Sequence, residues 1–211
     1  MNTSMSLFDG EVKCDGLISD YDEWDRKVRG ETFSFDFETE GKDFPNVKAL
    51  GYSLAINGSS TYVPLVDYRS ELKGFDPQRG IKLLKTIAQS PQLKIAHNLP
   101  FDLRILFEYG YEPVWPWACT MIGAFTHDCT AYGLSLGRLC KRYNIGEVLD
   151  YDELTEEGKG SKKFNRSMSS FSVHDLGNYS IPHAERTLEL VNIIKGCLVF
   201  TRQWDSFFKV D

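Results

Sequence analysis

The sequence predicts a single α/β domain in which a mixed β-sheet is flanked by helices. Strand patterns fill the stretch 32–66, and helical patterns then alternate with short apolar runs over the remainder of the chain. Strands that come first and helices that interleave afterwards are typical of this fold class. The chain has 211 residues, of which 42% are hydrophobic and 26% charged. That length and composition suit one globular domain with a well-buried core.

The composition excludes several classes of protein. No apolar run approaches the roughly 18–20 residues of a membrane span. The N-terminus lacks the basic region and apolar core of a signal peptide, so we expect a cytoplasmic protein without membrane contact. The 24 basic and 30 acidic residues give a net charge of −6, which repels nucleic acid unless local basic side chains or bound cations hold it. Five scattered cysteines without a C-x-x-C pair predict reduced, mostly buried thiols.

The chain divides by composition near residue 31. Residues 1–31 are polar and acidic, and we expect an N-terminal lead-in with one short helix. Residues 32–211 carry the apolar patterns of a folded domain. We therefore expect the core to be built from this second part.

Three strands are expected at the start of the domain. Aromatic residues alternate with small or acidic ones over 32–37, which is the period of a strand. The β-rich runs 47–56 and 61–66 lie on either side of Asn57-Gly58, a sequence typical of a hairpin turn. These three strands are expected to form an antiparallel meander.

Helical spacing of apolar residues dominates the rest of the chain. Asp76 and Pro77 are suited to the N-cap and the first position of a helix, and Gly110 is suited to ending one. Leu93–His97 is expected to be a short buried strand. The expected helices are 77–90, 100–109, 119–127, 135–144 and about 172–204.

Two carboxylates share one face of the first expected strand. Asp36 and Glu38 are two residues apart, so both side chains point to the same side of the sheet. Two neighbouring negative charges are unfavourable unless a cation lies between them, and oxygen ligands select hard cations such as Mg²⁺ or Mn²⁺. A solvated strand face with surface acids is the alternative interpretation.

Two later segments add polar groups at helical positions. Asp102 lies in the first turn of an expected helix, where a carboxylate also complements the helix dipole. Tyr179, His183 and Thr187 are spaced four apart and share a helix face. Taken alone, each segment is also an ordinary polar surface.

The order of these segments resembles a known family. Asp36-x-Glu38 on a strand is followed by 98–102, which reads Asn-Leu-Pro-Phe-Asp, and then by Tyr179-x-x-x-His183 on a late helix. This arrangement resembles the DnaQ-like, tyrosine-type superfamily of 3′–5′ exonucleases with four acidic residues. The resemblance is closest to the proofreading domain of family A DNA polymerases and covers residues 30 to about 195. It implies a ribonuclease H-like fold for the domain 32–211. Further similar segments are 120–121, 134–139 and 157–164.

The resemblance implies a role for each residue that matches a motif of the family. Two divalent cations, Mg²⁺ or Mn²⁺, hydrolyse the terminal phosphodiester at the 3′ end of single-stranded DNA in that family. Asp36 would bridge both ions, Glu38 would bind the nucleophile-side ion, and Asp102 would hold the second ion through water. Tyr179 would orient the attacking water. The residues implied to hold the terminal nucleotide are Phe37, Asn98, Leu99 and Phe101.

One basic cluster is a candidate for phosphate contacts. Residues 158–168 contain four cationic side chains and no acid, directly after an acidic stretch. A flexible arm on the nucleic-acid backbone and a solvated, salt-bridged loop are both compatible with this pattern. The cationic residues are Lys159, Lys162, Lys163 and Arg166.

The fourth acid of the family is missing. His183 stands where the family has a metal-ligating aspartate, and imidazole suits Mn²⁺ better than Mg²⁺. Glu185 is no simple replacement, because two residues along a helix lead to the opposite face. Pro182 removes a helix hydrogen bond, so a bent or restarted helix could point His183 elsewhere and leave Asp175 to serve the metal.

Three functions remain open from the sequence. An active 3′–5′ exonuclease with an altered metal site, acting on DNA, is favoured because segment 157–164 resembles the polymerase branch. A catalytically silent relative that binds DNA 3′ ends or a polymerase partner is the first alternative. An RNA-trimming exoribonuclease is the second. The expected partner is a single-stranded DNA 3′ end, with a separate DNA polymerase subunit as an open alternative.

Overall fold

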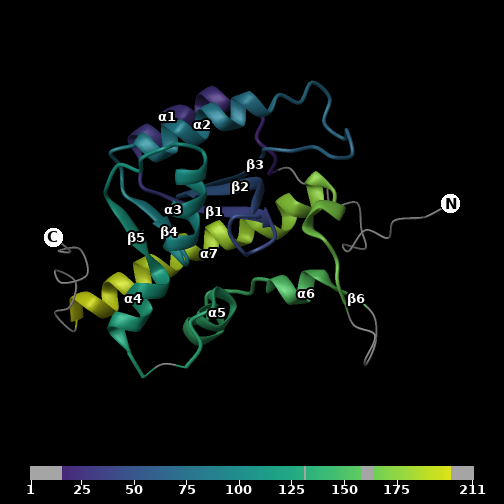
Figure 1. The fold of residues 1–211 in the computed structure, drawn as a ribbon. Helices are drawn as coiled ribbons and strands as arrows, with labels where there is room; N and C mark the ends of the chain where they lie inside the picture. Colours follow the sequence, from purple (N-terminus) through teal and green to yellow (C-terminus); the bar gives the residue numbers. More distant parts are fainter. Residues whose placement is uncertain (1–15, 131, 158–163, 201–211) are drawn as a thin grey trace.

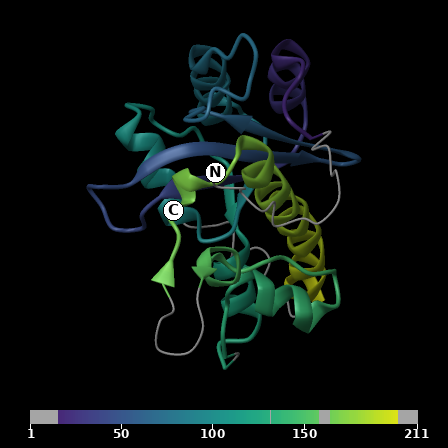
Figure 2. The ribbon, with the colours of Figure 1, turned by 90° about the vertical axis from the view of Figure 1, so that its right-hand side faces the viewer.

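The fold is a five-stranded mixed sheet with helices on both faces, as the sequence predicts. The computed structural model describes residues 16–130, 132–157 and 164–200. The strand order is β3-β2-β1-β4-β5, so the first strand lies at the centre. Figure 1 shows α1 and α2 together above the sheet, and Figure 2 shows α7 crossing its opposite face. The centre of the sheet is therefore covered on both sides.

The helices and strands follow the expected order along the chain. The strands are β1 (Phe33–Glu40), β2 (Lys48–Ile56), β3 (Ser59–Pro64), β4 (Lys94–Ala96), β5 (Trp117–Cys119), β6 (Glu156–Glu157) and β7 (Phe164–Asn165). The helices are α1 (Tyr21–Gly30), α2 (Pro77–Gln89), α3 (Leu99–Glu108), α4 (Thr120–His127), α5 (Leu136–Tyr143), α6 (Tyr151–Thr155) and α7 (Val173–Phe200), with a 3₁₀ turn at Met168–Ser170.

The antiparallel meander of the first three strands is confirmed. In β1 and β2, Asp36 pairs with Ser53 and Glu38 pairs with Gly51. The strands β4 and β5 then add in parallel beside β1. Parallel addition after a meander makes the sheet mixed and leaves both acids of β1 near its middle.

The main core lies between the sheet and the helices α1 and α2. Phe33, Phe35 and Phe37 alternate along β1 and are buried there, opposite in direction to the two acids. Trp24 and Val28 of α1 join the same core. The short helix expected in the lead-in is thus α1, and it packs with the domain, whereas the division at residue 31 stays a prediction.

The long helix α7 runs without a break through Pro182, so the bend or restart considered from the sequence does not end it. Two sheet hydroxyls hold the helix on either side of this proline. Ser53 Oγ donates to the Ser180 carbonyl at 3.0 Å, and Ser34 Oγ donates to the Ala184 carbonyl at 2.6 Å. These bonds fix the turn of α7 that faces the two acids of β1.

The expectations about the cysteines and about membrane spans can be compared with the described part of the chain. The cysteines described there are all free; Cys119 and Cys140 are buried, whereas Cys129 is exposed. No helix among residues 16–130, 132–157 and 164–200 has both the length and the apolar character needed to cross a membrane.

We predict that Ser34→Ala lowers the free energy of unfolding by about 1–2 kcal/mol, because it removes a buried donor to the Ala184 carbonyl. Urea denaturation measures this loss. Thr126→Ala is the matched control, since its hydroxyl bonds to the Ile122 carbonyl of its own exposed helix turn. Equal losses in both variants would contradict the idea that Ser34 anchors α7.

Candidate active site

Three side chains from β1 and α7 meet on the face of the sheet that α7 covers. Asp36, Glu38 and His183 each offer a ligand atom, and these atoms lie within 4.8 Å of one another. His183 Nδ1 lies 3.6 Å from Asp36 Oδ2. The alternation of β1 sends both carboxylates toward α7, and the anchored turn of that helix brings the imidazole to them.

Asp102 joins the site from the start of α3. Asn98 adopts a left-handed backbone conformation, with φ 59° and ψ 44°, and turns the chain sharply from β4 into the helix. Asp102 then lies buried in the first helical turn, where its Oδ1 accepts a hydrogen bond at 3.2 Å from the Phe37 backbone N–H. The bond joins α3 to the strand residue that separates Asp36 from Glu38.

A cavity of about 390 Å³ opens at this cluster. Most of the residues implied by the family resemblance line it, namely Asp36, Phe37, Glu38, Asn98, Phe101, Asp102, Tyr179 and His183. Leu99 is not in the cavity wall but in the main core, 5% exposed. Lys159, Lys162 and Lys163 lie outside the described residues. Arg166 places its guanidinium 4.5 Å from the centre of the Phe171 ring.

Four further residues line the cavity that sequence reasoning missed: Thr39, Lys42, His97 and Tyr151. Lys42 reaches the Tyr151 ring, with its Nζ 3.6 Å from the ring centre. The position of Lys42, just after the strand that carries Asp36 and Glu38, was an available signal. Tyr151 comes from a distant helix, and no local pattern connects it to the site.

The carboxyl groups of Glu38 and Asp102 both resist ionisation. Burial, followed by the negative charge of Asp36, raises the pKa of Glu38 to about 8. The same two causes raise the pKa of Asp102 well above its usual range. Glu38 Oε1 is also buried without a hydrogen-bond partner among the described residues. A group of acids of this kind is stabilised by a cation.

When no metal is bound, the protonated imidazole of His183 supplies positive charge beside these acids. Burial disfavours its charged form, but the hydrogen bond and charge of Asp36 and the charge of Glu38 outweigh burial and raise its pKa to about 9. Its Nε2 lies 2.9 Å from the Leu149 carbonyl oxygen. Because a carbonyl only accepts, Nε2 carries a proton, and Nδ1 is the nitrogen that faces Asp36.

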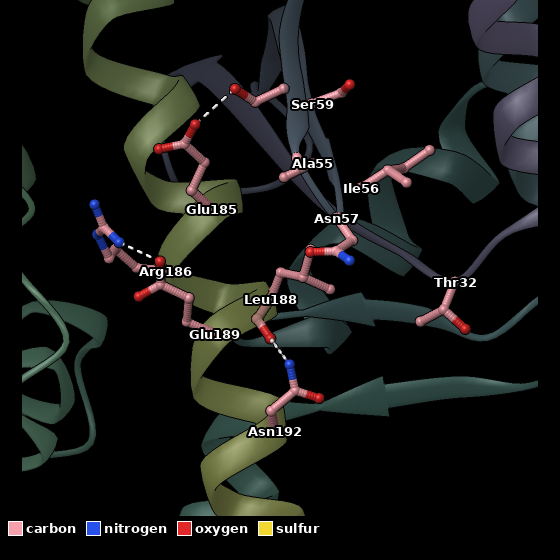
Figure 3. A pocket seen from close by; sticks show the side chains of 12 residues that line it. Thr32, Ala55, Ile56, Asn57, Ser59, Glu185, Arg186, Leu188, Glu189 and Asn192 are labelled. Carbon is pink, nitrogen blue, oxygen red and sulfur yellow. Dashed lines mark hydrogen bonds and ion pairs between the residues drawn. The ribbon is translucent and has the colours of Figure 1, made fainter.

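The alternatives to His183 lie elsewhere. Glu185 is on the other side of α7, as expected, and accepts a hydrogen bond from Ser60 Oγ at 2.6 Å in a separate cavity (Figure 3). Asp175 lies at the start of α7, where Ser172 Oγ accepts from the Asp175 backbone N–H at 2.9 Å and the Asp175 carboxylate accepts from the Ser172 backbone N–H at 3.4 Å. Neither carboxylate belongs to the cluster of Asp36, Glu38 and His183.

The donor set fits a divalent cation. Carboxylate oxygens are hard ligands; Glu38 Oε1 has no hydrogen-bond partner among the described residues, and Nδ1 of His183 can bind a cation once it gives up the proton that faces Asp36. The Leu149 carbonyl fixes the imidazole as outer partners of metal ligands commonly do. Asp36, Glu38 and His183 could thus hold one ion.

Comparison with known proteins identifies the family. Residues 14–198 match the family model described as 3′–5′ exonuclease. The chain belongs to the 3′–5′ exonuclease family. DNA polymerase I of Borreliella burgdorferi is 25% identical over 160 residues, which are 76% of this chain. The match spans 17% of the length of that polymerase. The resemblance predicted from the motifs is confirmed.

Solved structures show that this exonuclease chain has a ribonuclease H-like fold. The catalytic core of RRP6 from Trypanosoma brucei matches with a TM-score of 0.65 and 12% identity, over 95% of this chain and 52% of that one. Brucella melitensis NrnC with bound Mg²⁺ matches with a TM-score of 0.61 and 14% identity, over 90% of this chain and 83% of that one. At these identities the likeness concerns the fold alone.

We predict that the metal-free protein loses stability as the pH rises from about 5 to about 9. Glu38 and His183 have raised pKa values in the folded state, so the folded chain holds more protons than the unfolded chain in this range. Their stabilisation is complete below the ordinary values of 4.5 and 6.5 and is lost as the pH passes about 8 and about 9.

Mn²⁺ should reverse this loss, because a cation stabilises the ionised carboxylates and displaces protons from the site. The rise in melting temperature on adding Mn²⁺ is therefore expected to be larger at about pH 8 than at about pH 6. Calorimetry across this range measures it, with Glu38→Gln as the control that should shift less. A rise that is independent of pH would contradict the assignment.

Proposed function

We propose that this chain is an active 3′–5′ exonuclease that shortens single-stranded DNA with two divalent cations, and that His183 replaces the fourth acidic ligand. The observation that carries the proposal is the convergence of Asp36, Glu38 and His183 within 4.8 Å, at a cavity that also contains Asp102. A silent relative that only binds 3′ ends would have no need of this ligand set.

The chemistry divides between the cations and the chain. When bound, the divalent cations polarise the scissile phosphate and activate water. Asp36, Glu38 and His183 would hold the first ion, and Asp102 would hold the second. Burial raises the pKa of Tyr179, so its hydroxyl keeps its proton and can orient the attacking water by hydrogen bonding. The Tyr179 ring also packs 4.5 Å from the His183 ring and fixes its plane.

The terminal nucleotide occupies the cavity beside these groups. The Phe101 side chain and the Phe37 backbone line one part of the wall and favour stacking or apolar contact, which tolerates any base. Asn98 adds an exposed amide at the mouth. Lys42 is the one cationic Lys or Arg among the described residues that line this cavity, so it is the first candidate for a phosphate contact.

The basic cluster of residues 158–168 is the next candidate for phosphate contacts. Ser167 Oγ and the Ser169 backbone N–H donate to the Glu40 carboxylate, both at 2.7 Å, so residues 167–169 lie beside the end of β1. Arg166 and the three lysines Lys159, Lys162 and Lys163 are therefore proposed to contact the nucleic-acid backbone before it enters the cavity.

DNA is the proposed substrate because the sequence relative is a DNA polymerase I. A separate polymerase subunit is a proposed partner on the same ground. RNA is the second candidate, favoured by the fold neighbours RRP6 and NrnC, the latter also solved bound to pGG. Matched DNA and RNA oligonucleotides distinguish the two directly.

We predict that Asp36→Ala and Glu38→Ala each lower the rate of 3′→5′ shortening about a thousand-fold or more, because the ligand set is lost. A 5′-labelled single-stranded DNA, followed on a gel with and without a chelator, measures the rate. Glu185→Ala is the control, since its carboxylate lies in the other cavity and its loss should leave the rate unchanged. Binding without shortening in every divalent ion would favour the silent relative.

We predict that His183→Asp lowers the ratio of the Mn²⁺-supported rate to the Mg²⁺-supported rate. The substitution restores a hard oxygen ligand, so hydrolysis with Mg²⁺ should rise. His183→Ala should lower the rate with either ion. A ratio that is the same in the parent and in His183→Asp would remove His183 from the metal site.

We predict that Lys42→Met weakens single-strand binding and lowers the slope of log affinity against log salt by roughly 0.7, the value for one phosphate contact. Fluorescence anisotropy at several salt concentrations measures the slope. Lys85→Met is the matched control, because Lys85 is an exposed lysine on α2, across the sheet from the cavity. An unchanged slope for Lys42→Met would place the phosphate path elsewhere.

A further inference from the structure

The hydroxyl group of Tyr62 lies in the interior without a hydrogen-bond partner. Tyr62 belongs to β3 and is 0% exposed, and its Oη has no partner among the described residues. Its phenol tip lies over Gly51 of the neighbouring strand, where a Cβ would be only 2.2 Å from Oη. The absence of a side chain at residue 51 is therefore what allows the hydroxyl to reach across β2.

The strand beyond Gly51 presents Glu38 on the same face. Gly51 pairs with Glu38 in β1, and Tyr62 pairs with Ser53, which in turn pairs with Asp36. Directly paired residues share a face of the sheet, so the phenol leans toward the acids and not toward the main core. Glu38 Oε1 is likewise buried and has no hydrogen-bond partner among the described residues, although the Ser180 hydroxyl lies near enough to lower the pKa of this carboxyl. An unpaired donor and an unpaired acceptor thus approach each other from β3 and β1.

Electrostatics support this proximity. Burial raises the pKa of Tyr62 well above its usual range, and the one charged group that raises it further is Glu38. Tyr62 is not part of the cavity wall that Glu38 lines. Tyr62 therefore lies on the interior side of Glu38, and the cavity lies on the other side of Glu38.

We propose that Tyr62 is a positioning residue for Glu38: its hydroxyl donates a hydrogen bond to the Glu38 carboxylate when that carboxylate binds a divalent cation. The inference rests on the proposed metal site and deepens it. A carboxylate has more acceptor positions than one cation uses, and metal ligands are commonly held by such outer hydrogen bonds. The bond orients one Glu38 oxygen inward and leaves the other for the ion.

Packing alone does not account for a tyrosine at this position. Tyr62 packs among apolar side chains that include Leu50, Phe171 and Leu176, and a phenylalanine ring would fill the same space. A buried hydroxyl without a partner is unfavourable, so its presence calls for a partner that forms in another state of the site. The ionised, metal-bound state of Glu38 provides that partner.

The test compares Tyr62→Phe with a matched tyrosine. Tyr52 in β2 is also 0% exposed, but its hydroxyl donates to the Gly80 carbonyl at 2.8 Å on the opposite face of the sheet. Isothermal titration with Mn²⁺ gives the affinity of the full chain, and calorimetry gives the melting temperature without metal. Tyr62→Phe should fold normally, because the hydroxyl that it removes has no hydrogen-bond partner in the described part of the chain.

We expect Tyr62→Phe to weaken Mn²⁺ binding about ten-fold without lowering the metal-free melting temperature. Tyr52→Phe should lower that temperature and leave the affinity unchanged. In a Glu38→Gln background, Tyr62→Phe should cause no further loss of affinity, because the hydroxyl acts through the Glu38 carboxylate. A purely structural role would not produce this dependence on Glu38.

Two outcomes would overturn the inference in distinguishable ways. If the parent binds Mn²⁺ and Glu38→Gln weakens it, but Tyr62→Phe stays within about two-fold of the parent, Tyr62 has no positioning role. If the parent binds no divalent cation at all, the proposed metal site fails and the role of Tyr62 fails with it. The ¹³Cζ resonance of Tyr62 is assigned as the tyrosine signal that Tyr62→Phe lacks. In the unaltered chain, Mg²⁺ should shift this resonance, and an unmoved resonance counts against the hydrogen bond.

Discussion

The mutual repulsion of buried carboxylates is the constraint on which the rest of this structure depends. Asp36 and Glu38 leave the same face of the central strand, and Asp102 approaches them from α3. Burial and Asp36 keep the pKa values of Glu38 and Asp102 high, so the cluster cannot ionise fully without positive charge nearby. His183 supplies that charge in the metal-free chain, and a divalent cation supplies it more strongly. The folded site therefore requires positive charge to balance its ionised carboxylates.

The position of α7 determines whether His183 meets this requirement. A proline at residue 182 removes one helix hydrogen bond, yet Ser34 and Ser53 bond to carbonyls on both sides of it and keep the helix on the sheet. The Leu149 carbonyl then fixes which imidazole nitrogen faces Asp36. Neighbouring contacts thus hold the imidazole in one orientation, as its proposed role as a metal ligand requires.

The features that the sequence predicted well are those that follow from local periodicity. The shared face of Asp36 and Glu38 follows from strand alternation, and Asp76 with Pro77 marked the start of α2. The meeting of Asp102 with β1 was implied only by the family resemblance, because no local pattern carries tertiary distances. Tyr151 and Tyr62 were missed for the same reason, whereas the position of Lys42 just after β1 was a signal that the sequence offered. Leu99 was expected at the nucleotide, but its place in the first turn of α3 turns it into the core.

The central claim is that Asp36, Glu38 and His183 bind one divalent cation together. Anomalous diffraction from crystals soaked in Mn²⁺ tests it most directly, because the signal locates the ion independently of activity. The account predicts a peak about 2.0–2.3 Å from a carboxylate oxygen of Asp36, a carboxylate oxygen of Glu38 and Nδ1 of His183. A peak held by the carboxylates alone, with Nδ1 of His183 directed away from the ion, would contradict it.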